Sequence, residues 1–302
     1  MYNPGHNNEI LDFCLKERFD LVKAFPAQRY NENLPATCKY TPLPTFAQTE
    51  STLSILVGNT KYLWPKFLKF YSTEIFTRHS HPRYIPSSNH CASSTSYSEG
   101  SDNEEYKQQN PLDYYTRVSI KSIIEEIIPL KNLDYDIRYT FDLDEKRFVA
   151  FQIMAENASL AYYNRVCFLN IHKEHGPWIG LRAVITLDMK GPPNSSQLFP
   201  ELKNPYPEGD KLLESKMQEI FGSMNHHYHQ QPDNPDGNNF LDMKLEIKNE
   251  WYKFVELRDI ASGFMNKKSL DNWRYSEDQM EYHYTNSIEF LNKLINLTRK
   301  EN

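Results

Sequence analysis

Five polar or aromatic side chains interrupt two apolar runs in the segment from residue 161 to 182. They are Arg165, Asn170, His172, Trp178 and Arg182. Imidazole, indole and guanidinium groups supply hydrogen-bond donors and flat surfaces, which suit a ligand pocket better than a closed core. The alternative is that they lie on the solvent face of a sheet, where polar residues are ordinary. The first interpretation predicts a pocket with aromatic walls and cationic groups.

The strands expected around this segment follow from the hydrophobic pattern. Residues 166–171 and 178–185 are rich in β-forming residues and are separated by a His-Gly-Pro turn at 175–177. This arrangement predicts a strand pair joined by a short reversing loop. Alternation of apolar and polar residues predicts two further strands, at 52–57 and 135–143.

Helices are predicted where apolar residues recur every three or four positions. Five segments show this spacing: 8–24, 60–75, 118–128, 211–221 and 243–262. A further helix begins after Ser276, the expected N-cap, with Gln279 at the capping-box position. Residues 30–35 are expected to form an extended loop, whereas 148–161 fit either a strand or a helix.

Composition limits the class of protein. The 302 residues are 25% charged and 39% hydrophobic, as in an ordinary globular protein. The net charge of −6 argues against a general role on nucleic acid or an anionic membrane, because both need a basic surface. No apolar run approaches the roughly 20 residues of a membrane span, and no secretory signal is expected. Unpaired cysteine spacing indicates reduced thiols in a cytoplasmic protein; the cysteines are Cys14, Cys38, Cys91 and Cys167.

Two segments of low complexity, 78–109 and 225–240, contain few aliphatic residues. They bury too little surface to offset the entropy of ordering, so we expect disordered surface inserts. Residues 1–77 and 110–302 are then expected to form one domain. The histidines of the inserts are interpreted as solvated residues rather than metal ligands; they are His79, His81, His90, His226, His227 and His229. No phosphate-binding glycine loop, nucleophile elbow or paired-cysteine motif occurs.

A resemblance to a known family rests on six colinear matches. They are Phe25-Pro26 with Tyr30-Asn31-Glu32 and Leu34-Pro35, the strand at 53–57, Asn110-Pro111-Leu112-Asp113, Ala161-Tyr162-Tyr163 with Ile171-His172, Gly176, Trp178 and Arg182, Arg258-Asp259, and Arg274-Tyr275-Ser276-Glu277 with Gln279. On these residues the chain resembles the CblC-type cobalamin-processing chaperones, named for combined methylmalonic aciduria and homocystinuria type C. The resemblance covers about residues 8–77, 110–190 and 243–290.

The resemblance implies an α/β (α+β) fold with a flavin-reductase or nitroreductase-like mixed sheet flanked by helices. It implies a cytoplasmic enzyme that binds cobalamin base-off and removes its upper axial ligand. Alkylcobalamins are dealkylated by glutathione, and cyanocobalamin is decyanated with electrons from a thiol or a reduced flavin, FMN or FAD. The product passes to a CblD-type trafficking protein and on towards methionine synthase. Oxygen that reaches the reduced cobalt would add a thiol oxidase activity.

The same resemblance assigns site residues. Arg182 and Arg258 match the family's glutathione-binding arginines, and the guanidinium fork suits a carboxylate. The residues matched to the corrin lining are Val149, Ala150, Phe151, Gln152, Tyr163, Asn164, Arg165, Asn170, His172, Trp178 and Leu181. Structural roles compete with these assignments: Arg182 paired with an acid at the core edge, Arg258 at a helix C-terminus, His172 as a hydrogen-bonded wall and Trp178 in the core.

The chain departs from the family pattern at three places. The family's third arginine has no counterpart in residues 284–290, and Lys293 is the substitute that the sequence offers. Residues 156–159 replace a His-x-x-Gly element, and Asn170 replaces a cysteine. Two other functions therefore stay open: a cobalamin carrier without efficient chemistry, and a flavin-dependent oxidoreductase.

Overall fold

The computed structural model describes residues 18–35, 40–46, 50–80, 110–127, 133–142, 144–228 and 248–300. Most of both predicted inserts lies outside the described residues, as do Cys14, Cys38 and Cys91. The same holds for the histidine side chains that the sequence offers as metal ligands, which are those of His79, His81, His90, His226, His227 and His229.

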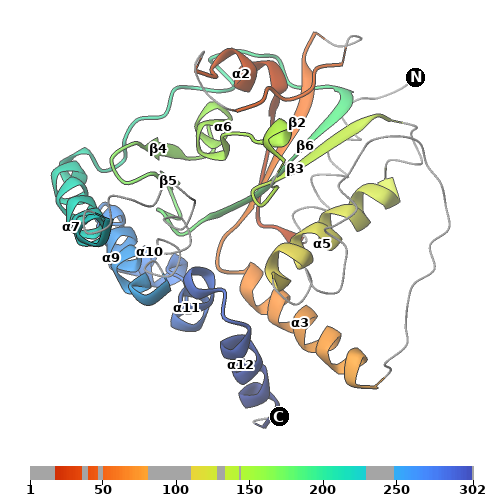
Figure 1. Ribbon diagram of the computed structural model, residues 1–302. Helices are drawn as coiled ribbons and strands as arrows, with labels where there is room; N and C mark the ends of the chain where they lie inside the picture. Colours follow the sequence, from red (N-terminus) through yellow and green to blue (C-terminus); the bar gives the residue numbers. More distant parts are fainter. Residues whose placement is uncertain are drawn as a thin grey trace.

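A four-stranded sheet forms the centre of the structure (Figure 1). Its strands lie in the order β1 (Leu21–Pro26), β2 (Thr52–Asn59), β6 (Gly180–Lys190) and β3 (Tyr135–Tyr139). Every described strand pair is antiparallel. The fold is therefore α+β, and the prediction of a mixed sheet is wrong, because no two described neighbouring strands run in the same direction.

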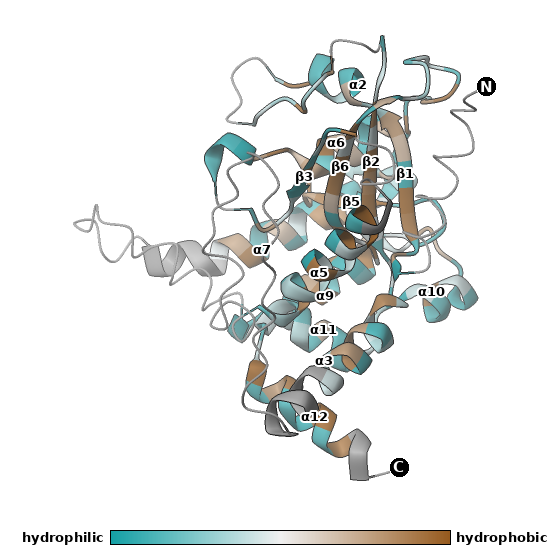
Figure 2. Cartoon of the chain, turned by 90° about the vertical axis from the view of Figure 1, so that its right-hand side faces the viewer, coloured by the Kyte–Doolittle hydropathy of each residue, from teal (hydrophilic) through white to brown (hydrophobic). Residues whose placement is uncertain are grey.

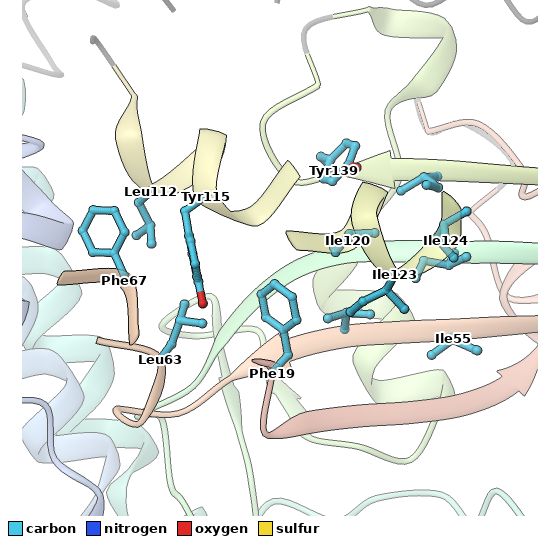
Figure 3. Packing of buried hydrophobic residues seen from close by; sticks show 14 of the residues in the cluster. Phe19, Ile55, Leu63, Phe67, Leu112, Tyr115, Ile120, Ile123, Ile124 and Tyr139 are labelled. Atoms are coloured by element: carbon cyan, nitrogen blue, oxygen red, sulfur yellow. The ribbon is translucent and has the colours of Figure 1, made fainter. Parts of the chain in front are cut away.

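One face of the sheet is covered by α3 (Leu63–Ser80) and α5 (Pro111–Ile127). Side chains of a strand alternate between the two faces, and Ile55 of β2 and Ile185 of β6 point to this one. Figure 3 shows the layer: Phe67 of α3 and residues of α5 such as Ile120 pack towards the strand that carries Ile55. Tyr282 and Leu291 from the C-terminal helices close the same cluster.

The opposite face is covered by α2 (Ala27–Glu32) and α6 (Phe151–Asn157). Leu56 of β2 and Val184 of β6 point to this face and are fully buried. Because β2 is buried on both faces, it is apolar along most of its length, as the brown colour of the strand in Figure 2 shows. The sheet therefore lies between two layers of helices.

A second group of elements lies beside the sheet. It contains a two-stranded sheet and five helices: β4 (Tyr162–Asn164), β5 (Leu169–Ile171), α7 (Asp210–Tyr228), α9 (Trp251–Ala261), α10 (Lys267–Trp273), α11 (Glu277–Thr285) and α12 (Ile288–Lys300). Short 3-10 turns occur at Glu145–Arg147 and Pro207–Gly209. Ile171, Leu213 and Leu257 join β5, α7 and α9 in one buried cluster. No described helix has the length and apolar character needed to cross a membrane.

Most predicted elements with a strong local pattern are confirmed. The strand at 52–57 is β2, and the helices at 60–75, 118–128 and 211–221 are α3, α5 and α7. Both α3 and α7 continue past the predicted ends, to Ser80 and Tyr228. The undecided segment 148–161 contains the helix α6. Of the helix predicted at 243–262, the part from Trp251 to Ala261 is α9.

Two predictions near the N-terminus are wrong. The helix expected at 8–24 does not include its last residues, because Leu21–Pro26 is the edge strand β1, paired with β2. The extended loop expected at 30–35 begins instead as the end of α2. Tyr30 is fully buried and its hydroxyl accepts a hydrogen bond from the Ala150 backbone N–H at 2.8 Å. Tertiary packing of this ring overrides the weak local signal.

The prediction of a strand pair around the His-Gly-Pro turn is also wrong. The first run pairs with β4 and the second with β2 and β3, so the two runs belong to different sheets. Their connection is a tight turn in which His172 and Gly176 exchange backbone hydrogen bonds of 2.8 and 2.9 Å. At the other predicted boundary, Ser276 precedes α11, but its side chain makes no capping hydrogen bond.

Gly176 tests the importance of this turn. Its φ is +59°, a conformation that costs an L-residue about 1–2 kcal/mol, and an added Cβ would meet the Met265 sulfur. We expect Gly176→Ala to lower the free energy of unfolding by about 1–2 kcal/mol in urea titrations. Gly222→Ala is the matched control: it lies in helix α7 with nothing near its Cβ position, so about 0.5–1 kcal/mol of stabilisation is expected. Equal effects at both positions would contradict the argument.

Candidate functional site

A cavity of about 350 Å³ opens between the start of β6 and the elements beside it. Its lining residues are Thr140, Val149, Phe151, Gln152, Phe168, Leu169, Asn170, Pro177, Ile179, Gly180, Leu181 and Arg258. They come from the end of β3, the start of α6, β5, the turn before β6, and α9. A hollow of this size, with apolar walls and a few amide and guanidinium groups, has the character of a small-molecule site.

Six of the residues assigned from the sequence line this cavity. They are Val149, Phe151, Gln152, Asn170, Leu181 and Arg258. The Asn170 side-chain amide donates to the Gln152 backbone carbonyl at 3.0 Å, which fixes the position of β5 against α6. Ala150 lies behind the lining, because it is buried among residues of α2 and α6.

Three assigned residues of the β4 region lie away from the cavity lining. Asn164 is buried, and its amide group bonds to the Asp210 carboxylate at 2.9 Å and to the backbone N–H of Val166. Arg165 is exposed and paired with Glu156 at 2.7 Å. Its guanidinium also lies over the Tyr163 ring, 5.1 Å from the ring centre. These contacts stabilise the local turn, and none of the three lines the cavity.

His172 and Trp178 are also placed by structural contacts. The His172 Nδ1 atom accepts hydrogen bonds from the backbone N–H groups of Glu174 and His175, and the two imidazole rings stack with centres 4.2 Å apart. Burial, then the charges of His175 and Lys173, lowers the pKa of His172 to about 4. Trp178 is fully buried and its indole N–H donates to Ser262 Oγ at 2.9 Å. Neither side chain lines the cavity.

Arg182 and Arg258 approach each other from β6 and α9. Arg182 donates from Nε to Asn59 Oδ1 at 2.6 Å, and burial lowers its pKa. Arg258 donates from Nε to the Tyr284 hydroxyl at 2.8 Å and from Nη1 to the Pro177 carbonyl. The positive charge of Arg258 also contributes to the lowered pKa of Arg182.

Neither arginine has a carboxylate within 4.0 Å among the described residues. Asp113 attracts Arg182 through space but forms no ion pair with it. The two arginines also affect His283. Burial chiefly, and then the positive charges of Arg182 and Arg258, lower the pKa of His283 well below its usual value near 6.5. Two partly buried cations without an acidic partner favour the binding of an anion.

Several lining residues have no distinct signal in the sequence, and Phe168 is the most informative. Its side chain is 56% exposed and its φ is +56°, which is uncommon for a bulky residue. In the sequence it is one more apolar residue of the run at 166–171, so the pattern indicates a buried position. The adjacent Cys167 is buried, and burial raises the pKa of its thiol to about 11.

Two further expectations concern cations and metals. Lys293 is exposed on α12 and does not line the cavity. Tyr284, in the segment that lacks the family's third arginine, instead accepts the hydrogen bond from Arg258. Within the described part of the chain, no group of three or more histidine, cysteine, aspartate or glutamate residues is placed to hold a metal ion.

Comparison with known proteins identifies the fold. No protein-family model and no curated protein sequence matches the chain. Among solved structures, the fold is similar to that of the C. elegans B12-trafficking protein CblC, a human MMACHC homologue. The TM-score is 0.61 at 14% sequence identity, over 95% of this chain and 94% of that one. The chain therefore has a CblC-like α+β fold over nearly its whole length.

Proposed function

We propose that this chain is a cobalamin-processing enzyme that binds cobalamin base-off and removes its upper axial ligand. The observation that carries the proposal is a pair of arginines that have no acidic partner among the described residues. Arg258 lines the cavity of a CblC-like fold, and Arg182, which is not itself a lining residue, lies against the lining residue Gly180. The solved protein of similar fold is described as a B12-trafficking protein. We also propose a cytoplasmic location and transfer of the product to a CblD-type protein and methionine synthase.

The arginines suit the glutathione half of this reaction. Glutathione carries two carboxylates at neutral pH, and a guanidinium binds a carboxylate with two parallel hydrogen bonds. Arg182 and Arg258 each keep N–H groups that make no hydrogen bond to the described residues. Nearby positive charge also lowers the pKa of a thiol and so favours the nucleophilic thiolate. The pair would therefore both hold glutathione and activate it.

The dealkylation step then balances without a redox partner. The glutathione thiol gives its proton to solvent, and the thiolate sulfur attacks the carbon bonded to cobalt. A sulfur–carbon bond forms and the cobalt–carbon bond breaks, with its electron pair left on the metal. The products are an S-alkyl glutathione and cob(I)alamin. Arg258 and the cavity wall would hold the two substrates in line for this displacement.

The cavity suits the edge of a corrin substrate. A corrin is broad, flat and fringed with amides, and it is matched by apolar walls with a few hydrogen-bonding groups. Phe151 and Leu181 supply apolar surface, and the amides of Gln152 and Asn170 supply polar groups. The exposed ring of Phe168 adds a flat apolar surface at the same hollow.

Decyanation needs an electron donor from outside the protein. We assign this role to a thiol or to reduced FMN or FAD acting as a diffusible substrate. A resident flavin nucleotide would compete for Arg182 and Arg258, the two arginines that we assign to glutathione. The thiol oxidase activity and a relationship to nitroreductases belong to the same proposal.

Anaerobic absorbance of the purified chain with methylcobalamin tests the proposal. A shift to the base-off spectrum shows binding, and appearance of cob(I)alamin after glutathione is added shows dealkylation. The absence of any shift would contradict cobalamin binding and leave a flavin-dependent oxidoreductase as the remaining candidate. The control is the same scan with glutathione and methylcobalamin but no protein.

One observation favours the carrier as a second candidate. Arg258 already donates two hydrogen bonds, to Tyr284 and Pro177, and Arg182 donates one to Asn59. Fewer N–H groups then remain for carboxylates, and weaker glutathione binding would leave cobalamin binding intact. A base-off shift that is not followed by cob(I)alamin would identify a carrier.

A further inference from the structure

The hydroxyl group of Tyr275 is buried and has no hydrogen-bond partner among the described residues. Tyr275 lies between α10 and α11, and the residue is 7% exposed. Most buried hydroxyl groups are hydrogen-bonded, because leaving one without a partner costs about 1–3 kcal/mol. A hydroxyl that stays unpaired in the folded chain is therefore a candidate donor to a ligand.

The ring of Tyr275 is held firmly in place. Arg274, the residue before it, forms a two-point ion pair with Asp259 at 2.7 and 2.9 Å, and Asp259 follows Arg258 in α9. The edge of the ring packs on Trp178, with ring centres 5.6 Å apart, and the ring of His283 lies 5.4 Å away. The ion pair thus joins α9 to the segment between α10 and α11 and holds Tyr275 against Trp178, whose ring also lies 5.9 Å from the Arg258 guanidinium.

The charges that act on the Tyr275 hydroxyl are chiefly those of the two arginines. Burial raises the pKa of Tyr275 to about 12, against the opposing effect of Arg258 and then Arg182. The hydroxyl therefore keeps its proton at neutral pH and is available as a donor. Ring contacts link Tyr275 to Arg258 through Trp178, whose ring packs on Tyr275 and lies 5.9 Å from the Arg258 guanidinium.

We propose that Tyr275 is a positioning residue that donates a hydrogen bond to the carboxylate held by Arg182 and Arg258. This inference rests on the proposed function, in which that carboxylate belongs to glutathione. A carboxylate has room for about four hydrogen bonds, so a hydroxyl donor can share it with the two guanidinium groups. A neutral donor completes the site without adding a third repelling charge.

Tyr275→Phe tests the inference, because it removes the hydroxyl and keeps the ring. Removal of an unpaired buried group is expected to leave the melting temperature unchanged or raise it by about 2 °C. The affinity for S-methylglutathione, which keeps both carboxylates but has no thiol, is expected to fall about tenfold or more in calorimetry. In turnover with glutathione, KM is expected to rise by a similar factor with little change in kcat.

The matched control is Tyr30→Phe, in the layer of α2 and α6 that covers one face of the sheet. Its hydroxyl has a partner, the Ala150 N–H, so its loss is expected to lower the melting temperature and leave S-methylglutathione binding unchanged. Equal affinity of the wild type and Tyr275→Phe would overturn the role of Tyr275 alone. Failure of the wild type to bind S-methylglutathione, measured without cobalamin, would overturn the glutathione site and this inference together. Cobalamin binding is judged separately, from the base-off spectrum.

Discussion

Replacement of Arg182 by methionine is expected to slow glutathione-dependent dealkylation of methylcobalamin about a hundredfold. Loss of one partner from a desolvated charge pair typically costs 2–5 kcal/mol, and Arg182 has no acidic partner among the described residues that would already satisfy it. The fold should survive, because removing a poorly paired buried charge offsets the loss of the hydrogen bond to Asn59. The measurement is the initial rate of cob(I)alamin formation under anaerobic conditions.

Two companion variants sharpen this prediction. Arg182→Lys keeps the charge but loses the planar fork, so only part of the rate is expected to return. Lys190→Met removes a cation from the exposed far end of the same strand, and its rate should match the wild type. A rate for Arg182→Met within twofold of the wild type would contradict the proposed glutathione site. The base-off shift should be the same in all three variants, because the arginine is assigned to glutathione rather than to the corrin.

The central elements of the fold can be predicted from the sequence because their signals are local. The run at 52–57 and the helix around Ile120 carry apolar residues at the spacing of a buried strand and an amphipathic helix. The strand β1 has no such local signal. Leu21–Pro26 contains Lys23 and ends in proline, and its strand form depends on pairing with β2. An edge strand that is fixed by its neighbour carries little information of its own.

The site could be predicted only in part, for the same reason. Arg182 and Arg258 are distinctive residues in the sequence, but the absence of an acid near them within the described structure is a property of the fold. The sequence pattern predicts a core position for Phe168, but its backbone conformation places it at the cavity. The sequence pattern predicts that Trp178 lines a pocket, although its side chain is fully buried and bonded to Ser262. Sequence spacing does not reveal which side of a turn faces a ligand.

The joining of two matched segments illustrates what tertiary structure adds. Arg258-Asp259 and Arg274-Tyr275 are separate motifs in the sequence, and the ion pair between Arg274 and Asp259 unites them. Within each motif one residue, Asp259 or Arg274, therefore holds the two segments together, and the other, Arg258 or Tyr275, is one that we assign to glutathione. A substitution at the ion pair is expected to act on glutathione through the position of Tyr275, whereas a substitution at Arg258 acts on it directly.

The His172–His175 stack gives the second large prediction, a loss of stability in acid. The unfolded chain protonates His172 near 6.5, whereas the folded chain does so at about 4. A histidine with a lowered pKa in the folded state contributes full stability above about pH 6.5 and loses it as the pH falls towards 4, because the unfolded state binds the proton first. At about 1.4 kcal/mol for each pH unit, the loss is about 3 kcal/mol. Urea unfolding between pH 7 and 4 measures it.

His172→Asn separates this titration from the acid sensitivity of the rest of the chain. An asparagine oxygen can accept the backbone N–H groups of Glu174 and His175 that the Nδ1 atom of His172 accepts, but it does not take up a proton. The variant is expected to be similar in stability to the wild type near pH 4.5 and less stable at pH 7, where the packed imidazole contributes fully. Parallel curves for both proteins would show that protonation of His172 is not what destabilises the turn. The turn ends at the start of β6, which carries Arg182. Unfolding of the turn in acid should therefore weaken S-methylglutathione binding over the same pH range in which the free energy of unfolding falls.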